Sequence, residues 1–163
     1  MKRVLSISLV ILVLLSLISF SVEAAENDGG TFFGTIVDIE YLDDGSYIVT
    51  YMDNGTIINP GDGTNATIVT KSKTKRFYNS AGETMWYVKV VGTFRYTGTT
   101  SSCTEVAHKA AALGSTWSII SASSSKSGAT ATATATARHS IGTGYNDYTR
   151  SVSLTCSPTG VFT

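Results

Sequence analysis

The run Thr84–Tyr96 constrains the fold more than any other part of the chain, because its large apolar side chains recur at every second position. In a β-strand, successive side chains point to opposite faces of the sheet. This alternation predicts a strand with one core face and one polar face, in which Gly92 leaves a gap. The residues of the predicted core face are Trp86, Val88, Val90, Phe94 and Tyr96.

A second run, Ala129–Ala137, alternates alanine and threonine without a break. As a strand, it carries a row of methyl groups on one face and β-branched threonines on the other. Close-packed interiors place small side chains opposite large ones. We therefore expect the alanine face to pack against the bulky residues Trp86, Phe94, Tyr96 and Trp117.

Turn signals divide the region 31–66 into three short runs that are rich in β-forming residues, namely Thr35–Leu42, Tyr47–Met52 and Thr56–Ile58. The turn candidates contain Asp-Gly and Asn-Gly pairs, which supply the positive φ angles that tight hairpins need. This pattern predicts a three-stranded β-meander.

Further strands are predicted at Thr67–Tyr78, Trp117–Ser123 and Tyr148–Cys156, with turns at Asn79–Glu83 and Ser124–Gly128 and a glycine-rich loop at Ile141–Asp147. Thr104–Leu113 is rich in alanine, so both a short helix and a strand remain open for it. Short strands at this spacing predict an all-β fold. We expect an immunoglobulin-like antiparallel β-sandwich over residues 67–163, preceded by the short meander, with the strand topology unassigned.

The N-terminal residues 1–24 have the pattern of a secretory signal peptide. A basic start precedes the apolar run Val4–Phe20, and small residues at Val22 and Ala24 mark a cleavage site, which would leave residues 25–30 as a flexible N-terminus. We therefore expect a secreted protein with no stable membrane insertion after cleavage. An uncleaved segment that anchors the protein to the membrane is the alternative.

The charge of the chain is balanced, with 12 basic and 12 acidic residues. Nucleic-acid binding needs a basic face that displaces counterions from the phosphates, so this balance argues against a nucleic-acid partner. The chain has two cysteines, Cys103 and Cys156. An even pair in an exported protein predicts a disulfide that staples the sandwich.

Three segments resemble a family of small secreted proteins of Gram-positive bacteria that has no established function. They are Phe77–Cys103, Gly128–Ala135 and Ser151–Gly160. The resemblance covers residues 77–163 and implies a secreted, β-rich domain with one disulfide. It brings no catalytic residues to transfer.

The sequence predicts no catalytic residues, no metal site and no cofactor, so we expect the protein not to be an enzyme. His108 and His139 have no cysteine or carboxylate at metal-ligand spacing. Asp38 and Glu40 share one strand face, as paired catalytic carboxylates can, but carboxylates that face solvent explain them better.

Two groups of residues are candidates for a ligand surface. Lys71, Lys73 and Lys75 alternate along one strand, with Arg76 beside them. This row has the charge to bind an anionic cell-wall polymer or headgroup. An edge strand that lysines protect from aggregation explains the same pattern, and this interpretation is favoured.

The second group is the tyrosines Tyr41, Tyr47 and Tyr51, which fit an aromatic platform for sugar rings and fit packing across a hairpin equally well. The sequence therefore predicts a secreted, non-enzymatic β-sandwich that acts through its surface, with an unknown ligand. The alternatives are a module that binds cell-wall polymer or carbohydrate, and a secreted effector or toxin-like protein.

Overall fold

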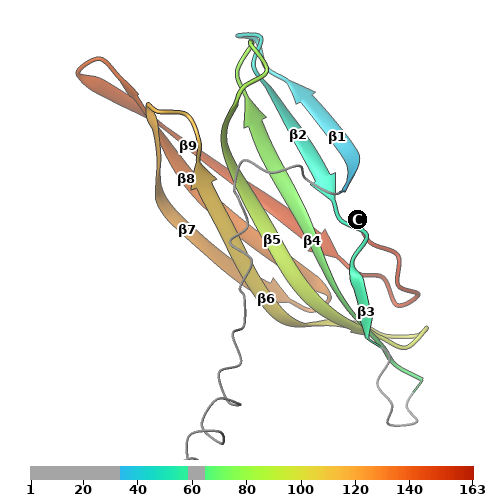
Figure 1. The fold of residues 1–163 in the computed structure, drawn as a ribbon. Coiled ribbons are helices and arrows are strands. Elements are labelled where there is room, and N and C mark those ends of the chain that lie inside the picture. The colour runs from blue at the N-terminus through green and yellow to red at the C-terminus, as the bar shows by residue number, and fades with distance from the viewer. Residues whose placement is uncertain (1–33, 59–64) are drawn as a thin grey trace, which may run out of the picture. The chain divides into compact units, whose positions relative to one another are not determined.

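The computed structural model describes residues 34–58 and 65–163, and all regular structure in these ranges is β-strand (Figure 1). The strands are β1 (Thr35–Tyr41), β2 (Tyr47–Met52), β3 (Thr56–Ile58), β4 (Thr67–Tyr78), β5 (Thr84–Tyr96), β6 (Ser101–Ala112), β7 (Trp117–Ser127), β8 (Thr130–Ile141) and β9 (Gly144–Thr155). Within these ranges no helix is long and apolar enough to cross a membrane. The predicted signal peptide at 1–24 and the flexible segment at 25–30 lie outside the described residues.

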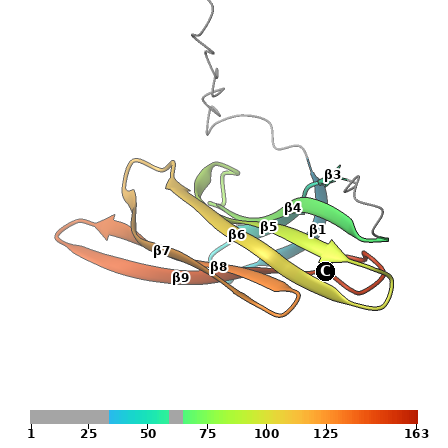
Figure 2. The same cartoon turned by 90° about the horizontal axis from the view of Figure 1, so that it is seen from below.

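The strands form two antiparallel sheets that pack face to face as a sandwich, which confirms the predicted all-β class (Figure 2). The large sheet has six strands in the order β1-β2-β4-β5-β6, with β3 also paired to β4, and the small sheet has the order β7-β8-β9. Neighbours within each sheet follow one another along the chain, except that β3 lies between β2 and β4 in the sequence. This connectivity, which the sequence left open, differs from the Greek-key connections of immunoglobulin domains.

The predicted three-stranded meander is wrong, because β2 and β3 do not pair with each other. Both pair with the same edge of β4, β2 opposite residues 73–78 and β3 opposite residues 68–70. Between them, the Asp53 carboxylate accepts hydrogen bonds from the backbone N–H of Ser72, at 2.9 Å, and from its hydroxyl, at 2.6 Å. This side chain holds the chain against β4, so the turn signal at 53–55 interrupts the edge without reversing its direction.

In two further segments the structure differs from the sequence prediction, and in a third it decides between alternatives that the sequence left open. The alanine-rich segment is the strand β6, because pairing with β5 from Trp86 opposite Ala112 to Phe94 opposite Cys103 outweighs the helix propensity of alanine. The predicted loop at 141–147 is a tight hairpin in which Gly142 adopts a φ of +57°. The turn predicted at 124–128 is shorter than expected, since β7 continues to Ser127.

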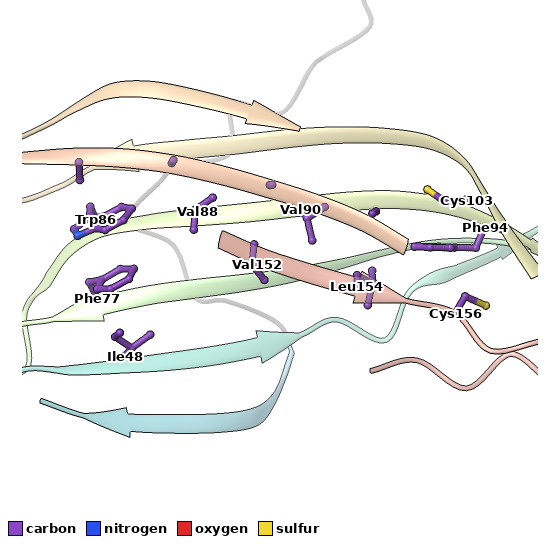
Figure 3. Close-up of a cluster of buried hydrophobic side chains, with 14 of the residues drawn as sticks. Ile48, Phe77, Trp86, Val88, Val90, Phe94, Cys103, Val152, Leu154 and Cys156 are labelled. Carbon is purple, nitrogen blue, oxygen red and sulfur yellow. The ribbon is translucent and has the colours of Figure 1, made fainter. Parts of the chain in front are cut away.

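The core lies between β5 of the large sheet and β8 and β9 of the small sheet (Figure 3). Trp86 is 1% exposed, and Val88, Val90 and Phe94 are fully buried, as the alternation predicts, while Tyr96 is half-buried. The alanines of β8 are also buried in this cluster, namely Ala131, Ala133, Ala135 and Ala137. The expected packing of a methyl row against bulky side chains is therefore confirmed.

The gap that the sequence predicts at Gly92 has a specific occupant. A Cβ atom at Gly92 would lie 2.5 Å from the ring of Phe94 and 3.1 Å from the Cβ of Ala131. Both distances are shorter than an ordinary van der Waals contact. The ring of Phe94 thus occupies the space that any side chain at this position would need.

Candidate functional site: a lysine cleft between the sheets

A cleft opens between the sheets because the small sheet has fewer strands than the large one. The small sheet packs over β4, β5 and β6, while the backbones of β1 and β2 do not approach it in the described ranges. The resulting cleft has a volume of about 520 Å³ and lies between β1, β2 and β4 on one side and β9 with Phe162 and Thr163 on the other. Volumes of this size are typical of ligand sites.

The lysine row of β4 faces this cleft. Lys73 is paired with Val90 and Lys75 with Val88, so these lysines share the inner face of the large sheet with the core residues of β5. Both line the cleft. Lys71 lies further along the same face, and its ammonium nitrogen is 5.1 Å from the centre of the Phe162 ring. The prediction that the three lysines share one strand face is confirmed.

The favoured explanation of this row as edge protection is wrong, because β4 is an interior strand. It pairs with β5 along one edge and with β2 and β3 along the other. Its backbone groups are therefore used within the sheet and offer no template for aggregation. The lysines point into the space between the sheets, where apolar side chains are the usual occupants.

The electrostatics of the cleft follow from this position. Burial lowers the pKa of Lys73 below its usual value, because a partly desolvated ammonium group is less stable in its charged form. The neighbouring charge of Lys75 lowers this pKa further, and the carboxylate of Asp38 opposes both effects. Asp38 belongs to the same row of the sheet, opposite Thr50, which in turn is opposite Lys75.

Arg76 does not belong to the lysine cleft. Consecutive side chains of a strand point to opposite faces, so Arg76 projects from the outer face of the large sheet. Its side chain is buried there, with the guanidinium carbon 5.7 Å from the centre of the Tyr87 ring. Arg76, which the sequence analysis grouped with the three lysines, is therefore separated from them by the thickness of the sheet.

The three candidate tyrosines share that outer face and pack together. The rings of Tyr41 and Tyr47 are 5.9 Å apart and tilted by 40°, and Tyr47 stacks on Tyr78 at 4.9 Å. The hydroxyls of Tyr51 and Tyr78 are 3.0 Å apart. Burial, aided by this hydrogen bond, raises the pKa of Tyr51 to about 12. These contacts match packing across a hairpin, in which Tyr78, which the sequence analysis missed, is the central ring.

The predicted disulfide is wrong, because Cys103 and Cys156 are separate buried thiols. Each thiol donates a hydrogen bond to a backbone carbonyl of its own segment, Cys103 to Glu105 and Cys156 to Ser157. Figure 3 shows the ring of Phe94 between the two thiols. Burial raises the pKa of both thiols, which makes them poor nucleophiles.

The two histidines have structural contacts. Nδ1 of His108 lies 3.0 Å from the hydroxyl of Ser124, and the ring of His139 stacks on Trp117 with the centroids 4.4 Å apart. In the part of the chain that the structure describes, no three histidine, cysteine, aspartate or glutamate residues gather as metal ligands would.

The sequence analysis also missed the contribution of β9 to the cleft. Ser151 and Ser153 line it, yet their hydroxyls bond to Thr134 at 2.7 Å and to Thr132 at 2.9 Å on the outer face of the small sheet. These two serines therefore contribute their backbone groups, at the edge of β9, to the lining of the cleft. The regular hydroxyl spacing of the two strands was visible in the sequence, but the position of the edge was not.

Comparison with known protein families, with curated proteins and with solved structures finds no match for this chain. The resemblance to small secreted proteins of Gram-positive bacteria therefore stays a prediction. The arguments about function below rest on the geometry of the lysine cleft.

Proposed function

We propose that the protein is an exported, non-enzymatic binding protein that holds an extended anionic ligand in the lysine cleft. The observation that carries this proposal is the position of Lys73 and Lys75. Both are half-buried between the sheets, and within the described ranges neither forms an ion pair.

This position is unfavourable for folding alone. An ammonium group that loses water without gaining a partner destabilises the folded state. An anion in the cleft would replace the lost hydration of both lysines, and the attraction is stronger there than at an open surface because less water screens it. Side chains in a cleft whose pKa is shifted by burial, as that of Lys73 is, are candidates for functional sites.

An anionic cell-wall polymer is one source of this ligand chemistry, because its charges repeat along a chain. The tyrosine group supports a carbohydrate platform less well. The ring of Tyr47 stacks on Tyr78, and the hydroxyl of Tyr51 forms a hydrogen bond with that of Tyr78. Of the three candidate tyrosines, only Tyr41, which is 76% exposed, therefore presents most of its ring to solvent. No observation favours the effector or toxin alternative.

Binding of labelled poly-L-glutamate and of polyphosphate, measured by fluorescence anisotropy at low and high salt, tests the proposal. We expect the double variant Lys73→Ala with Lys75→Ala to weaken binding by about tenfold or more, since two charge-assisted contacts are lost. The matched control, Lys89→Ala with Arg95→Ala, removes the same charge from the opposite face and should bind as the parent does.

Equal binding by the parent and both double variants would overturn the proposal, as would the absence of binding to either probe. Sedimentation with purified cell walls then tests the wall as the source of the ligand. Sedimentation of the parent and the control variant with the walls, while the cleft variant stays in solution, would identify the wall as a source of the ligand.

A further inference from the structure

We infer that the ligand of the lysine cleft is an acidic peptide in extended conformation, which pairs with the free edge of β9 and becomes a fourth strand of the small sheet. This inference rests on the proposed function and names the class of its ligand. Three features of the cleft carry it: the open edge of β9, the direction of its backbone groups and the spacing of the lysines.

The first feature is the edge. β9 is the last strand of the small sheet and pairs with β8 along one side. Along the other side, its backbone partner within the described residues is the short segment Val161–Thr163. Thr155 and Thr163 exchange two backbone hydrogen bonds, at 3.0 and 3.1 Å, and within the described residues no other segment pairs along this edge. The edge of β9 beyond this point lies in the cleft.

The second feature is the direction of the backbone groups. In an antiparallel ladder the N–H and C=O groups of alternate residues point to the same side. Those of Thr155 point away from β8, so the groups of Ser153 and Ser151 do so as well. The close hydroxyl pairs of these serines with β8 are those of non-hydrogen-bonded positions, which agrees with this assignment. Ser151 and Ser153 therefore present to the cleft N–H and C=O groups that have no backbone partner among residues 34–58 and 65–163.

The third feature is the lysine spacing. A strand added to β9 would lie about 4.8 Å from it and, since the two sheets of a sandwich pack about 10 Å apart, over the inner face of the large sheet. Every second side chain of this strand would point toward that face. Lys73 and Lys75 are themselves two residues apart on β4. Acidic residues at alternate positions of the peptide thus match the repeat of the lysines, because the strands of packed sheets run within about 30° of each other.

A peptide fits these features better than a purely anionic polymer does. A chain of phosphates can reach the lysines, but it has no N–H groups to pair with the carbonyls of β9. An extended peptide uses both the charges and the edge, as in other cases where a peptide adds a strand to a sheet.

The test compares three labelled probes on the full protein by fluorescence anisotropy. The first is an eight-residue peptide that alternates glutamate and threonine, the second is the same peptide with N-methyl groups on alternate backbone nitrogens, and the third is polyphosphate. Methylation keeps the charge and removes the hydrogen bonds of one edge. We expect the unmodified peptide to bind at least about tenfold more tightly than the other two.

The outcomes separate the two claims. If all three probes bind equally and their binding still depends on Lys73 and Lys75, the proposal of a peptide ligand is overturned and that of an anionic ligand is retained. Failure of every probe to bind would overturn both the peptide and the anionic ligand.

Two variants of β9 test the edge from the protein side. Ser153→Pro removes the outward N–H, and proline is tolerated at such edge positions because no bond of the ladder with β8 is lost. Ser153→Ala removes the hydroxyl and keeps the N–H. We expect only the proline variant to lose peptide binding, with circular dichroism spectra alike for both. Should the proline variant not fold, the methylated peptide still decides the question.

Sedimentation velocity tests whether a second copy of the chain occupies the edge. A dimer of the parent that disappears in Ser153→Pro would assign the edge to that copy and overturn the proposal.

Discussion

The inner face of the large sheet is divided into a dry region, which is centred on β5 and includes Phe77 of β4 and Ile48 of β2, and a cleft region that contains Lys73, Lys75 and Asp38. Val88 and Val90 of the dry region are fully buried under the small sheet. Their direct neighbours on β4, Lys75 and Lys73, lie in the cleft. Residues opposite one another in a ladder have Cβ atoms about 5 Å apart, so the change from core to cleft takes place across one strand spacing.

This contrast shows that the presence of a second layer, more than the strand pattern, determines whether part of an inner face becomes packed core or open cleft. Both regions alternate with period two, and both point to the same side of the sheet. Along β5, β8 and β9 complete a close-packed interior. Beyond the edge of β9 no strand of the described chain lies over the large sheet, and the charged side chains Lys73, Lys75 and Asp38 lie there beside Thr50 and Met52. The fold therefore leaves room for one more strand where its lysines are.

Replacement of Trp86 by alanine should have the largest effect and defines the dry region. Trp86 is fully buried and stacks on Phe77 with the ring centres 4.1 Å apart. We expect the free energy of unfolding to fall by about 3–5 kcal/mol in urea titrations, because a large cavity forms. Lys75→Ala, on the same face but in the cleft, should change it by less than about 0.5 kcal/mol. Similar losses in the two variants would erase the distinction between the regions.

An enlarged methyl row tests how tightly the dry region is packed. Ala133 is fully buried, so Ala133→Leu should lower the free energy of unfolding by about 1–3 kcal/mol through overpacking. Ser123→Leu places the same side chain on the exposed face of the small sheet and should stay within about 0.5 kcal/mol of the parent. A neutral Ala133→Leu variant would mean that the core has spare volume, contrary to its description as close-packed.

Removal of the charge of Lys73 should have the smallest effect, and its sign distinguishes the cleft from an ordinary surface. The pKa of Lys73 is lower in the folded protein than its usual value of 10.5, so its charged form destabilises the fold at neutral pH. Lys73→Met should therefore raise the free energy of unfolding at pH 7, by less than about 1 kcal/mol because the group is partly solvated.

This gain should shrink as the pH rises through the folded pKa toward 10.5, since Lys73 then becomes neutral in both states of the parent. Urea midpoints at pH 7 and pH 10 measure the difference, with Lys89→Met on the opposite face as the control. A variant that is less stable than the parent at pH 7 would show that Lys73 has a stabilising partner in the cleft.

Most of the strands could be predicted from the sequence, while the candidate site could be predicted only in part. The alternation in Thr84–Tyr96 and Ala129–Ala137 identified both core faces correctly. The lysine row was recognised, but its place on an interior strand depends on pairing with β2, β3 and β5, which are distant in sequence. Likewise, two cysteines in an exported chain suggest a disulfide, but nothing local indicates the distance between them.

The sequence by itself determined where strands form and which side chains share a face, because both follow from the local geometry of the backbone. Only the tertiary structure decided which strands are neighbours, where the small sheet ends and what each face meets. These features depend on contacts between residues far apart in the chain, and a local sequence pattern does not specify such contacts. The lysine cleft belongs to this second kind, since it depends on the small sheet of the described chain ending at β9 and leaving part of β4 uncovered.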